Sequence, residues 1–261
     1  MTAGTRSKGG VFIADDFRSN LLLDRYDPQL VGMRSSKRRH MQSENSEDVL
    51  SWNVFRSLRQ ISPAVWGPIL LPQALGDSAP KLVEPITIDL WRSISPPPSL
   101  LTEGDEGESE IDIVIESPEW VWFIEAKFKS DISTRTSSRA DRDQVLRNLD
   151  VGSYYAGCRD FYFSLLLRDG EASPLGKSKI DEYASLTEPR RRLETHRRDG
   201  LANLVAVTLH SWQVYAELFE AVSGTSVDPV EAFVAMQATQ WMTAKGLGRE
   251  SSAKAARPGE S

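Results

Sequence analysis

The stretch EIDIVIESPEWVWFIEAKF, residues 110–128, decides the fold, because it has the pattern of two β-strands joined by a tight turn. Apolar and polar residues alternate over residues 110–117, and an apolar run follows over residues 120–128. Ser117, Pro118 and Glu119 between them suit a hairpin turn. Further strands are expected at PITIDLWRSI (85–94), DFYFSLLL (160–167) and NLVAVTL (203–209), the last two apolar enough to be buried.

Helices are expected before, between and after these strands. SEDVLSWNVFRSLRQI (46–61) begins with Ser46 as a cap, and its apolar residues recur at helical spacing to form one buried stripe: Leu50, Val54, Leu58 and Ile61. Residues 139–157 and the segment SWQVYAELFEAV (211–222), with Ser211 as its cap, are also expected to be helical. Strands connected by helices in this order predict an α/β sandwich with a mixed central sheet.

The two ends of the chain are expected to differ from its centre. Residues 1–40 are interpreted as an N-terminal arm that is partly flexible, and residues 41–244 as one domain. Residues 245–261 are expected to form a disordered tail, because they are rich in Gly, Ser, Ala and charge and lack apolar periodicity. Residues 1–10 have the same character.

The alternation along the hairpin places its charged residues. Ile111, Ile113 and Ile115 should share one face of the first strand and Asp112 the other. On the second strand Glu125 and Lys127 lie opposite the tryptophan face. If the isoleucine and tryptophan faces pair side by side, two carboxylates and an ammonium project to the same side of the sheet.

Two converging carboxylates suit a hard cation such as Mg²⁺ or Mn²⁺. A neighbouring lysine can orient or deprotonate water and can offset the charge that grows on a phosphate. These are the requirements of phosphodiester hydrolysis.

At this point the chain resembles the PD-(D/E)xK nuclease superfamily, whose fold is also called restriction-endonuclease-like or Holliday-junction-resolvase-like. The resemblance rests on Asp112 in IDIVIE and on Glu125-Ala126-Lys127 thirteen residues later. It implies a restriction-endonuclease-like α/β/α sandwich and a Mg²⁺-dependent (or Mn²⁺-dependent) nuclease, with DNA as the expected substrate. The proline that commonly precedes the aspartate is missing, which leaves Glu110 as a competing residue.

The resemblance also implies a role for each matched residue. Asp112 and Glu125 would bind the metal together with the Ala126 carbonyl, and Lys127 would position the attacking water. Members of the superfamily often carry a glutamate on the first core helix, which would support a metal-bound water, and a glutamine on the helix after the third strand, which would steady the site. The matching residues are Glu47, Gln144 and, as a nearby basic residue, Arg147.

Each of these residues also has a plain structural interpretation. Glu47 could simply be a first-turn helix acid, and Asp112 could face solvent in an acidic stretch. The Glu125 and Lys127 pair could be an ordinary ion pair on a strand. A non-cleaving nucleic-acid-binding or assembly module on the same fold is therefore one alternative function. A hydrolase that acts on a small phosphate is another.

Charge and composition bear on the partners. Basic residues cluster at RSSKRRH (34–40) and EPRRRLETHRR (188–198), where Arg190, Arg191 and Arg192 are candidate contacts to nucleic-acid phosphates. A solvated helix face is the alternative. The net charge is -6, but residues 101–117 hold seven acids and no base, so the rest of the chain is at +1. The overall acidity therefore does not exclude a nucleic-acid partner.

Two further features of the composition exclude a zinc site and a membrane-spanning helix. One cysteine and three histidines exclude a Cys/His zinc site. No stretch approaches the ~20 apolar residues of a membrane helix, so we expect no membrane partner and a cytoplasmic location. A homodimer is left open.

Overall fold

A five-stranded mixed sheet forms the centre of the computed structural model, which describes residues 3–101, 107–133, 142–168 and 171–248. Its order follows the sequence: β3 (Thr87–Ile94), β4 (Ser109–Glu116), β5 (Trp120–Ala126), β6 (Asp160–Leu167) and β7 (Leu204–Ser211). The first three strands are antiparallel, and β5, β6 and β7 are parallel. The prediction of an α/β fold with a mixed sheet is confirmed.

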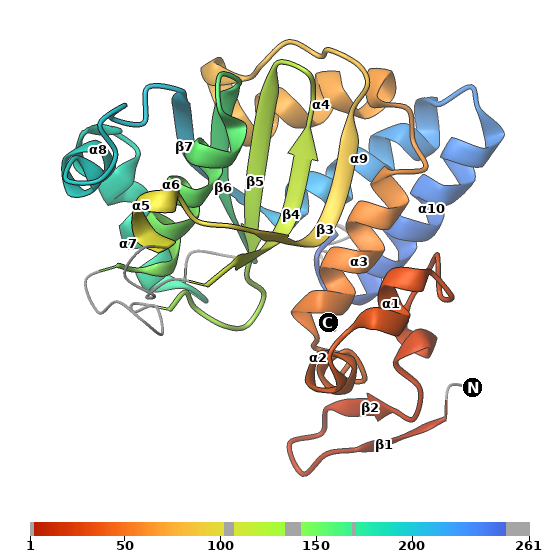
Figure 1. The fold of residues 1–261 in the computed structure, drawn as a ribbon. Helices are drawn as coiled ribbons and strands as arrows, with labels where there is room; N and C mark the ends of the chain where they lie inside the picture. The colour runs from red at the N-terminus through yellow and green to blue at the C-terminus, as the bar shows by residue number, and fades with distance from the viewer. Residues whose placement is uncertain (1–2, 102–106, 134–141, 169–170, 249–261) are drawn as a thin grey trace, which may run out of the picture.

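Helices cover both faces of this sheet (Figure 1). On one face pack α3 (Glu47–Leu58), α4 (Pro63–Leu75), α9 (Trp212–Thr225) and α10 (Pro229–Ala244). On the other lie α6 (Gln144–Ala156), α7 (Pro174–Tyr183) and α8 (Thr187–Leu193). Shorter turns are η1 (Phe17–Asn20), η2 (Gly76–Ser78) and α5 (Pro98–Leu101). The described part of the chain therefore has a helix, sheet and helix layering.

Some of the predicted caps, turns and helix starts agree with the structure and others differ. The side chain of Ser46 caps α3 by accepting a hydrogen bond from Val49 N–H, and the turn at Ser117 closes the β4–β5 hairpin. Ser211 is the N-cap of α9, but its side chain makes no capping hydrogen bond. The helix expected from residue 139 begins at Gln144, with Asp143 as its cap, and residues 134–141 lie outside the described residues.

Within the predicted arm of residues 1–40, residues 3–40 contain regular secondary structure. A small hairpin of β1 (Gly4–Arg6) and β2 (Phe12–Ala14) is followed by α1 (Pro28–Gly32) and α2 (Ser35–His40). Apolar side chains of this segment are buried in the same core cluster as α3: Phe17, Leu21, Leu30 and Met41. At the other end Leu247 is also buried, whereas residues 249–261 of the predicted tail lie outside the described residues.

Two core clusters follow the predicted strand faces, with one exception. Trp120, Trp122, Ile124, Ala126 and Phe128 pack on the α3 face together with Ile113 and Ile115. Ile111 was expected there too, but it packs in the opposite cluster beside α6. The expectation of one isoleucine face is therefore wrong at this end of β4, where the strand is irregular.

Two long helices, α4 and α10, had no counterpart in the sequence prediction. Pro68 and Pro72 lie inside α4, where proline lacks the N–H that a helix interior uses, so the pattern argued against a helix. Within the described residues, no helix is long and apolar enough to cross a membrane.

Candidate functional site

The candidate site lies where β4 and β5 separate. Their pairing runs from Glu116 opposite Val121 to Ile113 opposite Ile124. At the next position the carboxylate of Asp112 takes the place of a strand partner, and its Oδ2 accepts a hydrogen bond from Ala126 N–H at 3.0 Å. This arrangement puts the side chain of Asp112 in the fork between the two strands.

The neighbouring strand β3 is also irregular at this level. Its pairing with β4 passes from Leu90 opposite Ile113 to Arg92 opposite Ile111, and the residue between, Trp91, has a φ of 55°. A positive φ in an aromatic residue costs energy and marks a local break in the pleat. This break lies at the level of Asp112, next to the point where Ile111 turns to the other face.

Glu125 is the most enclosed carboxylate of the site, with 2% of its surface exposed. Its Oε1 accepts hydrogen bonds from Lys127 Nζ at 2.7 Å and from Gln144 Nε2 at 2.6 Å. Its Oε2 accepts one from Asn148 Nδ2 at 2.9 Å. Because both carboxylate oxygens accept hydrogen bonds from neighbouring side chains, the orientation of this carboxylate is fixed.

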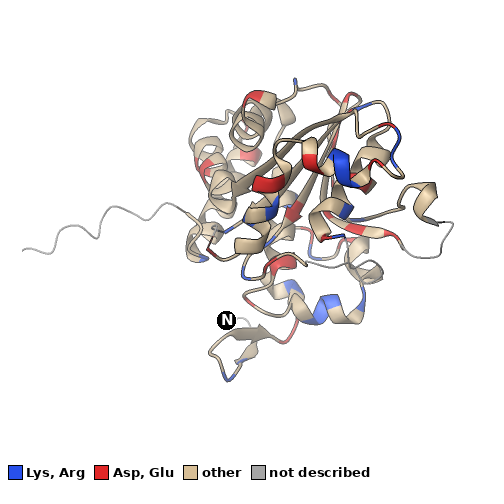
Figure 2. Cartoon of the chain, turned by 90° about the vertical axis from the view of Figure 1, so that its left-hand side faces the viewer, with Lys and Arg blue, Asp and Glu red and all other residues tan. Residues whose placement is uncertain are grey.

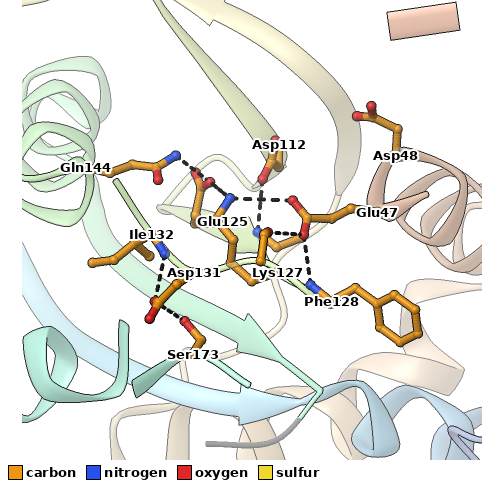
Figure 3. Close-up of polar contacts among 12 residues, drawn as sticks. Glu47, Asp48, Asp112, Glu125, Lys127, Phe128, Asp131, Ile132, Gln144 and Ser173 are labelled. Atoms are coloured by element: carbon orange, nitrogen blue, oxygen red, sulfur yellow. Dashed lines mark hydrogen bonds and ion pairs between the residues drawn. The ribbon is translucent and has the colours of Figure 1, made fainter. Parts of the chain in front are cut away.

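Lys127 lies between two carboxylates. Its Nζ is 2.7 Å from Glu125 Oε1 and 3.5 Å from Glu47 Oε1 (Figure 3). The backbone is held as well, because Lys127 N–H donates to the Leu166 carbonyl at 2.8 Å and Trp212 Nε1 donates to the Lys127 carbonyl at 3.0 Å. The ammonium group therefore has a defined position at the end of β5.

Glu47 is the first residue of α3 and joins this helix to the end of β5. Its Oε2 accepts hydrogen bonds from Phe128 N–H at 2.8 Å and from Ser130 Oγ at 2.9 Å. Glu47 therefore lies where the start of α3 meets the end of β5.

The close carboxylates perturb one another. Burial and, next to it, the charge of Glu125 together raise the pKa of Asp112 to about 7, against the lowering effect of Lys127. Burial also raises the pKa of Glu47. Burial alone would lower the pKa of Lys127, but three carboxylates around it outweigh that effect and hold the pKa above its usual value. Lys127 is therefore positively charged, and Asp112 loses its proton only at a higher pH than an exposed aspartate does.

Some residues of the site were missed in the sequence. Asn148 follows Gln144 by four residues on α6, so both amides face Glu125, and this spacing was the available signal. Lys37 was seen only as part of a basic run. Its Nζ lies 3.3 Å from Asp48 Oδ1 and 2.5 Å from Glu110 Oε1. The competing acid Glu110 is thus paired with Lys37.

The predicted nucleic-acid contacts are all engaged with other groups of the protein. Arg147 donates to the carbonyl oxygens of Gly107 and Glu108. On α8, Arg191 pairs with Glu188 at 2.5 Å. The other two are also engaged: Arg190 donates to the Leu204 carbonyl, and Arg192 lies 3.5 Å from Asp143 Oδ2.

The side chains of the candidate site supply only part of the ligands that a hard cation needs. Among the described residues, no group of three or more His, Cys, Asp or Glu side chains is arranged to hold a metal. Magnesium, however, uses one or two carboxylates and completes its shell with water and phosphate oxygens. Asp112 and Glu125 supply such a pair, and within the described residues Asp112 Oδ1 accepts no hydrogen bond.

Comparison with known proteins gives no relative for this chain: no family model, no curated protein and no solved structure matches it.

Proposed function

We propose that this protein is a metal-dependent nuclease that hydrolyses phosphodiester bonds in DNA by a PD-(D/E)xK-type mechanism. The observation that carries the proposal is the meeting of Asp112, Glu125 and Lys127 at the fork of β4 and β5. Glu47 from α3 and Gln144 from α6 reach the same place. Charged groups are costly to bury, and a fork that gathers so many of them is typical of a working site.

The order of elements supports a restriction-endonuclease-like fold. The helix α3 with its acid precedes three antiparallel strands, and α6 with its amides then leads to the parallel strands β6 and β7. The resemblance implies the same order, with a glutamate on the first core helix and a glutamine on the helix after the third strand. It places the acid of α3 and the amides of α6 on either side of Lys127.

A divalent cation would be held by Asp112 and Glu125 with the Ala126 carbonyl. Burial and the charge of Glu125 raise the pKa of Asp112, and a bound cation would offset both effects because it stabilises the ionised carboxylate. When bound, Mg²⁺ or Mn²⁺ would polarise a phosphate and make water a better nucleophile.

Four further side chains of the site would assist this metal-dependent hydrolysis. Lys127 remains protonated, so it acts by donating hydrogen bonds to a water or a phosphate oxygen and by offsetting negative charge. Glu47 would hold a water near Lys127. Gln144 and Asn148 keep the Glu125 carboxylate in one orientation.

The test is a cleavage panel with duplex, single-stranded and four-way-junction DNA and with RNA, each in Mg²⁺, Mn²⁺ or EDTA. Wild type, Lys127→Ala and Asp112→Ala are compared. We expect metal-dependent cutting that both substitutions strongly reduce. A non-cleaving module on the same fold would instead bind without turnover and behave identically in Lys127→Ala, and that result would reject the nuclease.

A further inference from the structure

The short helix α2 carries the most concentrated positive charge next to the candidate site. Residues 34–40, RSSKRRH, contain four Lys or Arg and no acid. Figure 2 shows these basic residues on the helix beside the N-terminal hairpin. The side chains of Arg34 and Arg39 are exposed.

The position of α2 is fixed by the residues between and after these arginines. Lys37 forms ion pairs with Asp48 and Glu110 and lies over the Trp91 ring at 4.2 Å. Just after the helix, Met41 is fully buried, and its carbonyl accepts a hydrogen bond from Asn20 Nδ2. These contacts hold α2 in place, so its exposed arginines project from a well-packed helix.

Two cavities flank α2, and both reach the carboxylates. One of about 480 Å³ is lined by Arg34, Lys37 and Asp112 among others. The second, of about 520 Å³, is lined by Arg39, Lys129 and Glu47 among others. His40 and Asp48 line both cavities. Exposed cations thus stand on the two sides of the cluster in which phosphodiester cleavage is proposed.

The two arginines are also uncommitted. Within the described parts of the chain, neither Arg34 nor Arg39 makes a side-chain hydrogen bond or ion pair. The arginines of α8 differ, because each of Arg190, Arg191 and Arg192 already contacts an oxygen of the protein. A polyanion that approaches the carboxylates of the candidate site is repelled by them. Unpaired cations close by reduce this repulsion, and α2 supplies them.

We infer that α2 binds the sugar-phosphate backbone of the DNA, with Arg34 and Arg39 holding phosphates on opposite sides of the bond that is cut. For the nature of its ligand this inference rests on the proposed function. It replaces α8 with α2 as the main electrostatic contact. Phosphate contacts of this kind fix the position of a strand without reading its sequence.

The experiment measures binding of the full chain to a short fluorescein-labelled DNA duplex by anisotropy, in EDTA, over a series of salt concentrations. Each phosphate contact contributes about 0.9 to the slope of log K against log salt. Arg34→Ala/Arg39→Ala should therefore lower the slope by about 1.8 and weaken binding on the order of tenfold to a hundredfold near 0.1 M salt. Arg34→Lys/Arg39→Lys keeps both charges and should retain most of the slope.

The matched control is Arg59→Ala/Lys81→Ala, which removes two exposed charges elsewhere. Arg59 follows the last turn of α3, about 18 Å along the helix from Glu47. Equal losses in the two double variants, no loss in either, or no binding by wild type would each overturn the inference. Binding that depends on α2, without any cleavage in Mg²⁺, would support the surface and reject the nuclease.

Discussion

The backbone N–H of Ala126 donates a hydrogen bond to Asp112 Oδ2 at 3.0 Å, where Asp112 lies one position and Ala126 two positions beyond the last paired residues of β4 and β5. The bond satisfies an N–H that would otherwise be buried without a partner as the strands separate. It also holds a carboxylate close to Glu125, which costs energy because the two charges repel. Asp112 therefore has a structural role as an acceptor and an electrostatic cost as an anion.

Asp112→Asn separates these two roles, because asparagine can still accept from Ala126 N–H but carries no charge. At pH 8 without metal we expect its unfolding free energy to exceed that of wild type by about 1 to 4 kcal/mol. Cleavage should be lost. Chemical denaturation measures the stability, and Asp181→Asn on the exposed side of α7 is the control. A less stable Asp112→Asn would contradict the electrostatic cost.

The stability of the metal-free protein should depend on pH through Asp112. Its pKa is about 7 in the folded chain against an ordinary value of 3.8. Between these values the folded state keeps a proton that the unfolded chain has released, so unfolding free energy from this group falls as pH rises. It is level above about pH 7. Thermal unfolding in EDTA should show a decline over this window, reduced in Asp112→Asn.

Magnesium should stabilise the protein more at high pH than at low pH, because a cation competes with the proton on Asp112. At a concentration one hundred times its dissociation constant, a ligand that binds only the folded state adds about 2.7 kcal/mol. The melting temperature with Mg²⁺ and with EDTA is compared at pH 5 and pH 8. The same increase at both pH values, or in Asp112→Asn, would place the metal elsewhere.

Lys127→Ala should reduce DNA cleavage by about 10² to 10⁴, the usual contribution of a group that positions water or a proton. Its ammonium group lies 2.7 Å from Glu125 Oε1, and among the described residues no other cation forms an ion pair with this carboxylate. Lys177→Ala, an exposed lysine of α7, is the matched control and should cut like wild type. Initial rates at saturating Mg²⁺ decide the comparison.

Asn148→Ala should destabilise the protein by about 1 to 3 kcal/mol, because it leaves Glu125 Oε2 buried without its donor. Cleavage should fall as well, since the carboxylate is no longer held. Gln240→Ala on the exposed side of α10 makes a similar change without such a contact. If the two variants unfold alike, the amide of Asn148 does not hold Glu125.

The hairpin and its charged face could be predicted because alternation along a strand is a local property. Glu125, Lys127 and the tryptophan face follow from it directly. Ile111 could not be placed, because the irregularity of β4 lies beside Trp91 of a neighbouring strand and alternation within β4 does not reveal it. Glu47 and Gln144 were suggested by the family resemblance rather than by periodicity.

The contribution of the N-terminal segment could not be seen in the sequence. Its helices are short and carry few apolar residues, and their stability comes from contacts made far along the chain, such as Lys37 with Glu110. In α4 the two internal prolines opposed the helix, and its burial against α9 and the sheet overrides that local preference. Tertiary contacts therefore decided both segments.

The turn at Ser117 also has a consequence for how the chain folds. It joins β4 to β5 directly, so Asp112, Glu125 and Lys127 come together by closing a short loop, which is fast and loses little chain entropy. Glu47 and Lys37 arrive from segments much farther away in sequence. We expect the acids of the hairpin to meet early in folding and the N-terminal segment to close over them last.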